Sequence, residues 1–96
     1  PSPQLIIRES ARYFQLSEED LRGQNRSKAT ATARQISMYL IRTLTNLPLK
    51  EIGAEYGDRN HSTVLSSIRK VEELLKSDPE IAATVRDITS NINSKN

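Results

Sequence analysis

The chain contains no cysteine and no tryptophan, and its 96 residues include only one histidine, one phenylalanine and three glycines. The absence of cysteine excludes disulfides, thiolate metal sites and a cysteine nucleophile, and it fits a reducing compartment. No apolar run approaches the length of a membrane span, and no signal-peptide pattern precedes the first expected helix. We therefore expect a cytoplasmic, nucleoid-associated location. Because the chain begins at Pro1 rather than at methionine, we also expect a fragment of a longer protein.

Sequence patterns typical of enzymes are also missing. His61 is the only histidine, and no arrangement of serine, aspartate or glutamate points to a catalytic triad. Neither GxxxxGKS/T nor GxGxxG occurs, so no loop is suited to cradle the phosphates of a nucleotide. The acidic residues lie mainly in first turns of expected helices, without metal-ligand spacing. We expect no enzymatic activity, no metal and no cofactor in this chain.

The charge is small in total but unevenly distributed. The net charge is +2, yet the segment from Leu21 to Lys50 carries six basic residues and no acidic one. The rest of the chain carries eight basic and twelve acidic residues. Such segregation is expected where one face meets a polyanion. A solvated helix face would have the same composition, so the charge alone leaves both interpretations open.

The stretch from Leu47 to Leu75 predicts two helices joined by a tight turn. Pro48 suits the first turn of a helix, Gly57 can take the positive φ that ends it, and Asn60 is a good N-cap for the next helix. The second helix repeats apolar residues at steps of four, three and four: Val64, Ile68, Val71 and Leu75. This pattern is typical of a helix-turn-helix, whose second helix can enter a major groove.

The other segments also predict helices, and none alternates with period two for long enough to indicate a strand. The expected helices span Pro3–Phe14, a short segment between Ser17 and Gly23, a segment capped by Thr30 or Thr32 that runs to about Thr45, and one that begins at Asp78-Pro79. We expect residues 24–30 to form an exposed basic loop, Asn46 to end its helix in the left-handed conformation, and the polar tail 90–96 to fray. The predicted fold is all-α, a compact TrpR-like bundle of about six helices in one domain spanning residues 1–96.

The polar tip of the second motif helix is the best candidate for contact with DNA bases. A helix N-terminus offers unpaired N–H groups, and the side chains of His61, Ser62 and Thr63 can reach base edges. Alternatively, Asn60 is only a cap and His61 only a surface residue. Arg26, in the basic loop, can enter a minor groove or remain a solvated arginine.

Two segments resemble one family closely. RSKATATARQISMYL (Arg26 to Leu40) and LKEIGAEYGDRNHSTVL (Leu49 to Leu65) resemble the C-terminal DNA-binding domain of the bacterial chromosomal replication initiator DnaA. The resemblance implies binding to duplex boxes similar to TTATNCACA at the replication origin, in support of initiation. By position it assigns base contacts to Arg26 (minor groove), Arg34, Gln35, Asn60, His61, Ser62 and Thr63, and backbone contacts to Lys28, Arg42, Leu49 and Lys50.

Three positions depart from the pattern of that family. Asn60 stands where aspartate is usual, Ser62 where threonine is usual, and Lys50 where proline is often found. Asn60 keeps the cap but adds amide donors, so the preferred base at one or two positions of the box can change. The ATP- and magnesium-binding AAA+ module of the family is absent from this chain, which we expect to be monomeric. Acidic phospholipid contact is attributed to the region that joins the two modules, so we expect it of the parent protein rather than of this chain.

Two other functions remain open from the sequence. A free-standing helix-turn-helix repressor would share the DNA chemistry but would need a dimer to read a palindrome. A protein-interaction module would instead expose the apolar stripe of the last helix to a partner: Ile81, Val85, Ile88 and Ile92.

Overall fold

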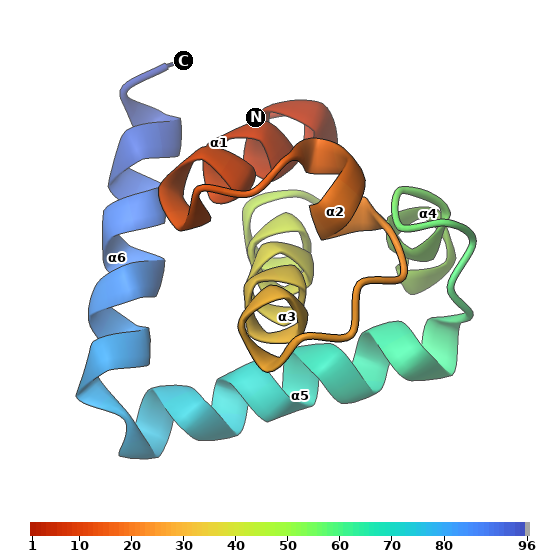
Figure 1. Ribbon diagram of the computed structural model, residues 1–96. Coiled ribbons are helices and arrows are strands. Elements are labelled where there is room, and N and C mark those ends of the chain that lie inside the picture. Colours follow the sequence, from red (N-terminus) through yellow and green to blue (C-terminus); the bar gives the residue numbers. More distant parts are fainter. Residues whose placement is uncertain (96) are drawn as a thin grey trace.

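The computed structural model describes residues 1–95, which form six α-helices and no strand (Figure 1). This confirms the all-α prediction with about six helices. The helices are α1 (Pro3–Phe14), α2 (Glu18–Arg22), α3 (Lys28–Leu44), α4 (Leu49–Ala54), α5 (His61–Ser77) and α6 (Pro79–Asn93). Within the described part, no helix is long and apolar enough to cross a membrane.

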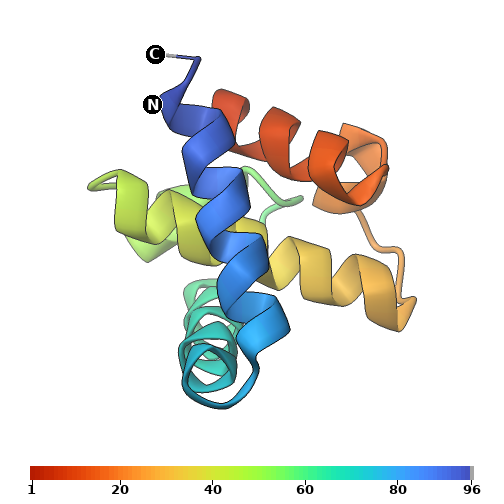
Figure 2. The same ribbon diagram turned by 90° about the vertical axis from the view of Figure 1, so that its left-hand side faces the viewer.

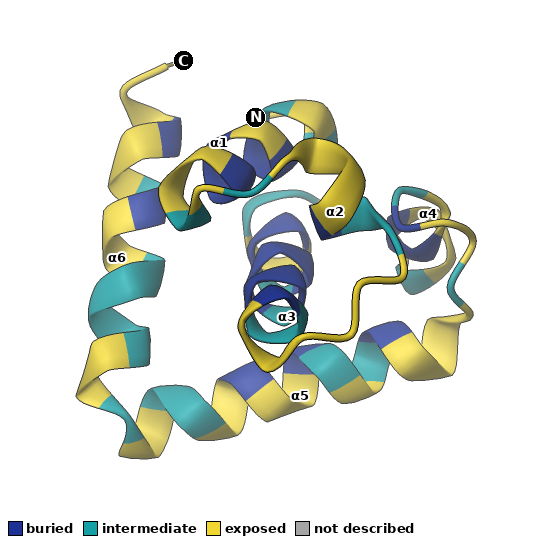
Figure 3. Ribbon diagram, in the orientation of Figure 1, coloured by how far each residue is buried: buried dark blue, intermediate teal, exposed yellow. Residues whose placement is uncertain are grey.

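Helix α3 is the central element, and the other helices surround it (Figures 1 and 2). Helices α1 and α2 lie on one side of α3 and α5 crosses the other side, while α6 runs from the end of α5 back to α1. The apolar faces of all six helices turn toward this centre, as the dark residues in Figure 3 show. Fully buried members include Ile6, Ile7, Leu21, Ile36, Ile41, Ile52, Val64, Val71, Ile88 and Ile92. Burial of this shared core is the main stabilising contribution to the fold.

Local capping residues define most of the helix ends, as expected. Ser17 Oγ accepts from the N–H of Asp20, Asn60 Oδ1 from Thr63, and Asp78 Oδ1 from Glu80 and Ile81. Gly57 has φ of 69°, so the glycine turn also forms as predicted. These caps satisfy N–H groups that have no partner inside their own helix.

The start of α3 lies earlier than the sequence predicts. Ser27, not Thr30 or Thr32, is the N-cap: its Oγ accepts from the N–H of Thr30 at 3.2 Å and donates to Thr30 Oγ1 at 2.9 Å. Thr30 is buried in the first turn and therefore unavailable as a cap outside the helix. The exposed loop is consequently shorter, covering residues 23–27.

Three other expectations about helix ends are wrong. Pro48 is the N-cap of α4 rather than a residue of its first turn. Asn46 does not adopt a left-handed conformation, because α3 ends through an extended Thr45 whose N–H donates to the carbonyl of Ile41. The polar tail is helical as far as Asn93, since Ile92 is completely buried and holds that turn against the core. Asn96 lies outside the described residues.

The apolar stripe of α6 is not available to a partner. Ile88 and Ile92 are completely buried, and Ile81 and Val85 pack partly buried against the same core. The structure therefore assigns this stripe to the interior of the domain.

Candidate nucleic-acid interface

The turn between α4 and α5 is unusually close to α4 itself. Two consecutive residues, Gly57 and Asp58, have positive φ values of 69° and 57° and reverse the chain direction. The chain then returns so near to α4 that a Cβ atom on Gly53 would lie 2.0 Å from the carbonyl oxygen of Arg59. The N–H of Arg59 donates to the carbonyl of Gly53 at 3.1 Å. This contact fixes the direction in which α5 begins.

The tip of α5 presents an exposed row of polar side chains. Asn60, His61, Ser62 and Thr63 are all exposed, and Asn60 Oδ1 caps the helix through the N–H of Thr63 at 3.0 Å. The backbone N–H groups of His61 and Ser62 have no partner among residues 1–95. Unpaired N–H groups at a helix N-terminus favour an anionic ligand. The tip thus combines an attraction for phosphate with side chains able to read bases.

An open pocket of about 450 Å³ joins this tip to α4. Its walls bring Lys50, predicted to contact the backbone of DNA, next to Asn60 and His61, predicted to contact bases. The N-cap residue of α4, Pro48, makes no side-chain hydrogen bond to that helix. Leu49 is half-buried, and Lys50 is exposed. Lys50, Asn60 and His61 therefore belong to one concave surface at the entrance to α5, and Leu49 directly precedes Lys50 in the chain.

The loop between α2 and α3 presents two of the predicted basic contacts. Arg26 and Lys28 are exposed, one on the loop and the other in the first turn of α3. The loop turns at Asn25, whose Oδ1 accepts from the N–H of Ser27 at 2.9 Å. Without other side-chain partners among the described residues, the guanidinium of Arg26 can reach toward a groove.

Arg34 has a different environment from the other predicted contacts. Only 7% of this residue is exposed, and its guanidinium donates from Nε to the carbonyl of Leu21 at 2.8 Å. Its Nη2 donates to the carbonyls of Asp20 at 3.0 Å and Asn25 at 3.1 Å. A base contact by Arg34 stays a prediction. To donate to a base from these nitrogens, the guanidinium would have to break its hydrogen bonds to the three carbonyls.

Two further predicted contacts lie on α3. Gln35 is half-buried, next to Arg34 in sequence, while Arg42 is exposed near the end of the helix. Nη1 of Arg42 donates to the carbonyl of Leu47 at 3.0 Å, which ties α3 to the linker before α4. The remaining guanidinium donors of Arg42 have no acceptor within residues 1–95 and can meet a phosphate.

Arg59, the residue before the tip, is bound to three backbone carbonyls. Its Nη1 donates to the carbonyls of Arg22 at 3.0 Å and Tyr56 at 2.8 Å, and its Nη2 donates to that of Gly23 at 2.6 Å. Arg22 in turn pairs with Glu55 at 2.9 Å. No periodicity could have revealed these bonds, because the acceptors are backbone carbonyls that every residue possesses.

Arg34 and Arg59, which meet at the junction between the end of α2, the loop before α3 and the turn before α5, remain positively charged. Burial lowers the pKa of Arg34, which the positive charge of Arg59 lowers further, and burial also lowers the pKa of Arg59. An arginine nevertheless stays protonated in proteins. Burial raises the pKa of Tyr56 far above its usual range, so its phenol stays neutral and can act as a donor. The junction therefore places positive charge directly behind the exposed loop.

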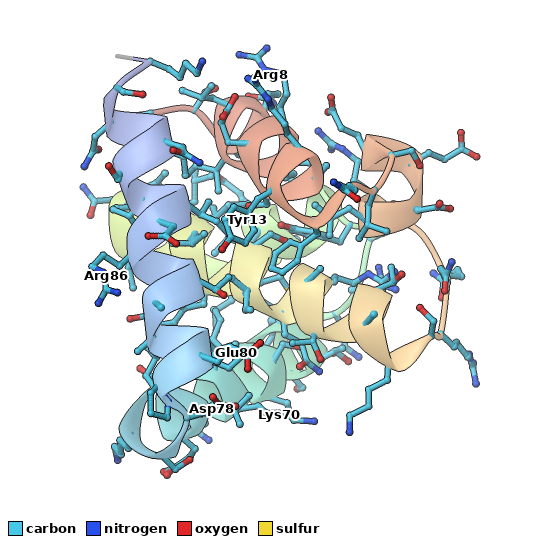
Figure 4. All side chains as sticks on the ribbon, turned by 60° about the vertical axis from the view of Figure 1, so that its left-hand side comes forward. Arg8, Tyr13, Lys70, Asp78, Glu80 and Arg86 are labelled. Carbon is cyan, nitrogen blue, oxygen red and sulfur yellow. The ribbon has the colours of Figure 1, made fainter. Side chains whose placement is uncertain are left out.

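The other end of α5 carries acidic residues beside basic ones, such as Glu73, which pairs with Lys76 at 3.6 Å. Asp78 and Glu80 lie at the corner where α5 meets α6 (Figure 4), about 24 Å along the helix from His61. Tyr13 of α1 is 39% exposed on the α6 side of the molecule (Figure 4), and its hydroxyl donates to Asp87 Oδ2 at 3.5 Å. At the near end, Asp58 lines the same pocket as Lys50 and His61, so both ends of α5 carry charges of both signs.

Comparison with known proteins agrees with this geometry. The family model described as the bacterial dnaA protein helix-turn-helix matches residues 3–71. The chain is 48% identical over 91 residues to the chromosomal replication initiator protein DnaA of Leifsonia xyli, covering 95% of this chain and 19% of that protein. It is 45% identical over 86 residues to the DnaA protein of Thermus thermophilus, covering 90% of this chain and 20% of the relative.

A third relative extends the comparison. The DnaA protein of Crocosphaera subtropica is 41% identical over 92 residues, covering 96% of this chain and 20% of that protein. The chain therefore spans about a fifth of the length of the curated relatives it matches. With the family model matching more than two thirds of its length, this chain belongs to the bacterial DnaA helix-turn-helix family.

Proposed function

We propose that this chain binds double-stranded DNA at DnaA-box-like sites and supplies origin recognition for the initiation of chromosomal replication. The observation that carries the proposal is the composite surface formed by the tip of α5, the start of α4 and the Arg26 loop. It joins exposed side chains able to read bases with basic groups at the same entrance. Phosphate contacts position a protein on the duplex, and contacts with base edges give specificity.

The residues divide into three groups by what they can reach. The exposed tip residues Asn60, His61, Ser62 and Thr63 read base edges in the major groove, and Gln35 of α3 contacts bases in the same groove. Arg26 enters the adjacent minor groove, where the negative potential is enhanced. Lys28, Arg42, Leu49 and Lys50 contact the phosphate backbone, the two residues of α4 through the start of that helix.

The chain acts in this proposal as one module of a larger AAA+ initiator, which would supply ATP and magnesium binding. The module itself is monomeric, is not an enzyme, binds no cofactor and works in the cytoplasm. Any contact with acidic phospholipids belongs to the parent protein. A monomer of this kind reads one box at a time, in contrast with a dimeric repressor that reads a palindrome.

The test compares a duplex carrying TTATNCACA with the same duplex in which the box is permuted, at one salt concentration. A specific site should gain about 4 kcal/mol or more over non-specific DNA. Equal affinities for the two duplexes would refute the proposal. A dimer in sedimentation would favour the repressor instead.

Two substitutions separate base reading from backbone contact. His61→Ala should remove about 1–3 kcal/mol of discrimination between the two duplexes. Lys50→Ala should weaken binding to both duplexes by the same factor. It should also make the slope of log affinity against log salt concentration less steep by about one. If His61→Ala lowered the affinity for both duplexes by the same factor, the inference that His61 reads bases would be wrong.

A further inference from the structure

The exposed Arg26 loop is held by two arginines that lie behind it. Arg34 and Arg59, here called the arginine clamp, together donate five hydrogen bonds to the carbonyls of Asp20, Leu21, Arg22, Gly23 and Asn25. These carbonyls belong to the end of α2 and to the loop itself. The last carbonyls of a helix have no partner within it, and α2 has only five residues. The clamp therefore replaces the bonds that so short a helix cannot make.

The two arginines reach the loop from different parts of the DNA-binding surface. Arg34 comes from α3, the central helix, while Arg59 immediately precedes Asn60, the first residue of the tip. The backbone of Arg59 is itself fixed through its bond to Gly53 in α4. Arg59 thus connects α5, α4 and the Arg26 loop. A guanidinium has a planar fork of donors, which suits it to hold several carbonyls at once.

Neighbouring contacts reinforce the same junction. Arg22 Nη1 donates to both the carbonyl and the carboxylate of Glu55, which ties the end of α2 to the turn after α4. Gly23 has no room for a side chain, because a Cβ there would lie 2.8 Å from the carbonyl of Glu19. The loop therefore leaves α2 in a direction set by groups outside the loop.

We propose that Arg59 is a positioning residue for DNA recognition: it sets the distance and direction of the Arg26 loop relative to the α5 tip, so that the two grooves are read in one fixed register. Arg59 does this through backbone carbonyls, without contacting DNA. This inference rests on the proposed function. It adds Arg59 as a residue that affects specificity by positioning Arg26. Pre-organisation of this kind lowers the entropy lost when Arg26 is ordered on the duplex.

The first test is a double-mutant cycle with Arg26→Ala and Arg59→Ala in the full chain, measured on the box duplex. Each single variant should bind the box duplex with an affinity at least about tenfold lower than that of the unmodified chain, as expected for the loss of one base contact. The double variant should bind no more weakly than the weaker single variant, because Arg59 acts through Arg26. If the fold-loss of affinity in the double variant equalled the product of the two single fold-losses, the inference would be overturned. An unchanged affinity in the single variant Arg59→Ala would also overturn it.

A second readout separates positioning from general stability. Replacing adenine by 2,6-diaminopurine, one A·T pair at a time, adds an amino group to the minor groove and leaves the major groove unchanged. The unmodified chain should lose affinity at the pair that Arg26 reads, and Arg59→Ala should lose that sensitivity while retaining discrimination in the major groove. Equal sensitivity in both proteins would contradict the inference. Arg59→Lys, which keeps the charge but not the fork, should behave as Arg59→Ala.

A third readout uses no DNA. The ¹⁵N heteronuclear NOE of residues 24–27 should fall in Arg59→Ala while the values in α1, α3 and α6 stay unchanged. Arg86→Ala is the matched control, because Arg86 is an exposed arginine on α6 far from the loop (Figure 4). Unchanged NOE values in Arg59→Ala would overturn the inference even if the unmodified chain bound boxes. If the unmodified chain showed no preference for the box, the proposed function would fail while this readout still tested the loop.

Discussion

Gly53→Ala places one methyl group where the structure has no room for it. The new Cβ would lie 2.0 Å from the carbonyl oxygen of Arg59 and 3.1 Å from its carbonyl carbon. Ordinary contacts of a Cβ begin near 3.4 Å, so the carbonyl oxygen must retreat by about 1.4 Å. Both atoms are backbone, and no side-chain rotation can relieve the overlap.

The expected cost combines three terms. Overpacking of a tight site costs about 1–3 kcal/mol. Loss of the hydrogen bond from Arg59 N–H to Gly53 adds about 0.5–1.5 kcal/mol. Alanine is favoured over glycine in a helix by about 1 kcal/mol, which offsets part of the cost. We therefore expect the free energy of unfolding to fall by about 0.5–3.5 kcal/mol.

The displacement also affects DNA recognition, because Arg59 directly precedes the tip. We expect Gly53→Ala to reduce the ratio of affinities for the box and the permuted duplex, in conditions where urea unfolding shows that the variant is folded. Arg86→Gly is the control: it costs a similar amount, about 1 kcal/mol, in an exposed turn of α6 and should leave the ratio unchanged. A Gly53→Ala protein with the stability and the affinity ratio of the original chain would refute the close approach of α4 and the turn.

Two further substitutions test interactions inside the fold. The single proton of Ser37 Oγ goes to the carbonyl of Arg34 at 2.7 Å, so the hydroxyl of Tyr56 must be the donor in its 2.6 Å bond to Ser37. Tyr56→Phe should therefore lower the free energy of unfolding by about 0.5–1.5 kcal/mol in urea titration, whereas an unchanged midpoint would disprove the bond. Asp78→Ala removes the cap of α6 and should cost about 1 kcal/mol, read as a lower melting temperature, with the affinity for the box unaltered. A change in that affinity would mean that the far end of α5 also takes part in binding.

The features that the sequence predicts correctly depend on residues close together in the chain. Gly57 and Asn60 specify a turn and a cap through their own conformation, and the helix from His61 to Ser77 follows from its apolar stripe. The start of α3 was mistaken because Ser27, Thr30 and Thr32 are all chemically able to cap. Burial of Thr30 decides between them, and burial is a property of the whole fold.

The environment of the predicted contacts was harder to foresee. The family resemblance assigns Arg34 to the bases by position, yet its guanidinium lies among carbonyls of α2 and the loop. Arg59 has the same kind of partners. An acidic partner would have been visible as a charge in the sequence, but a carbonyl partner leaves no trace in residue types. Such bonds can be found only once the path of the backbone is known.

The direction of α5 has a kinetic consequence. The aligned peptide dipoles of its 17 residues give the tip a partial positive charge and the opposite end a partial negative charge. The field of a duplex exerts a torque on this dipole that turns the tip of α5 toward the phosphates before contact. Productive encounters should then be enriched over random collisions, and the gain in association rate should vanish as salt shortens the range of the field. The length and direction of α5 would thus help to determine how fast its tip finds DNA.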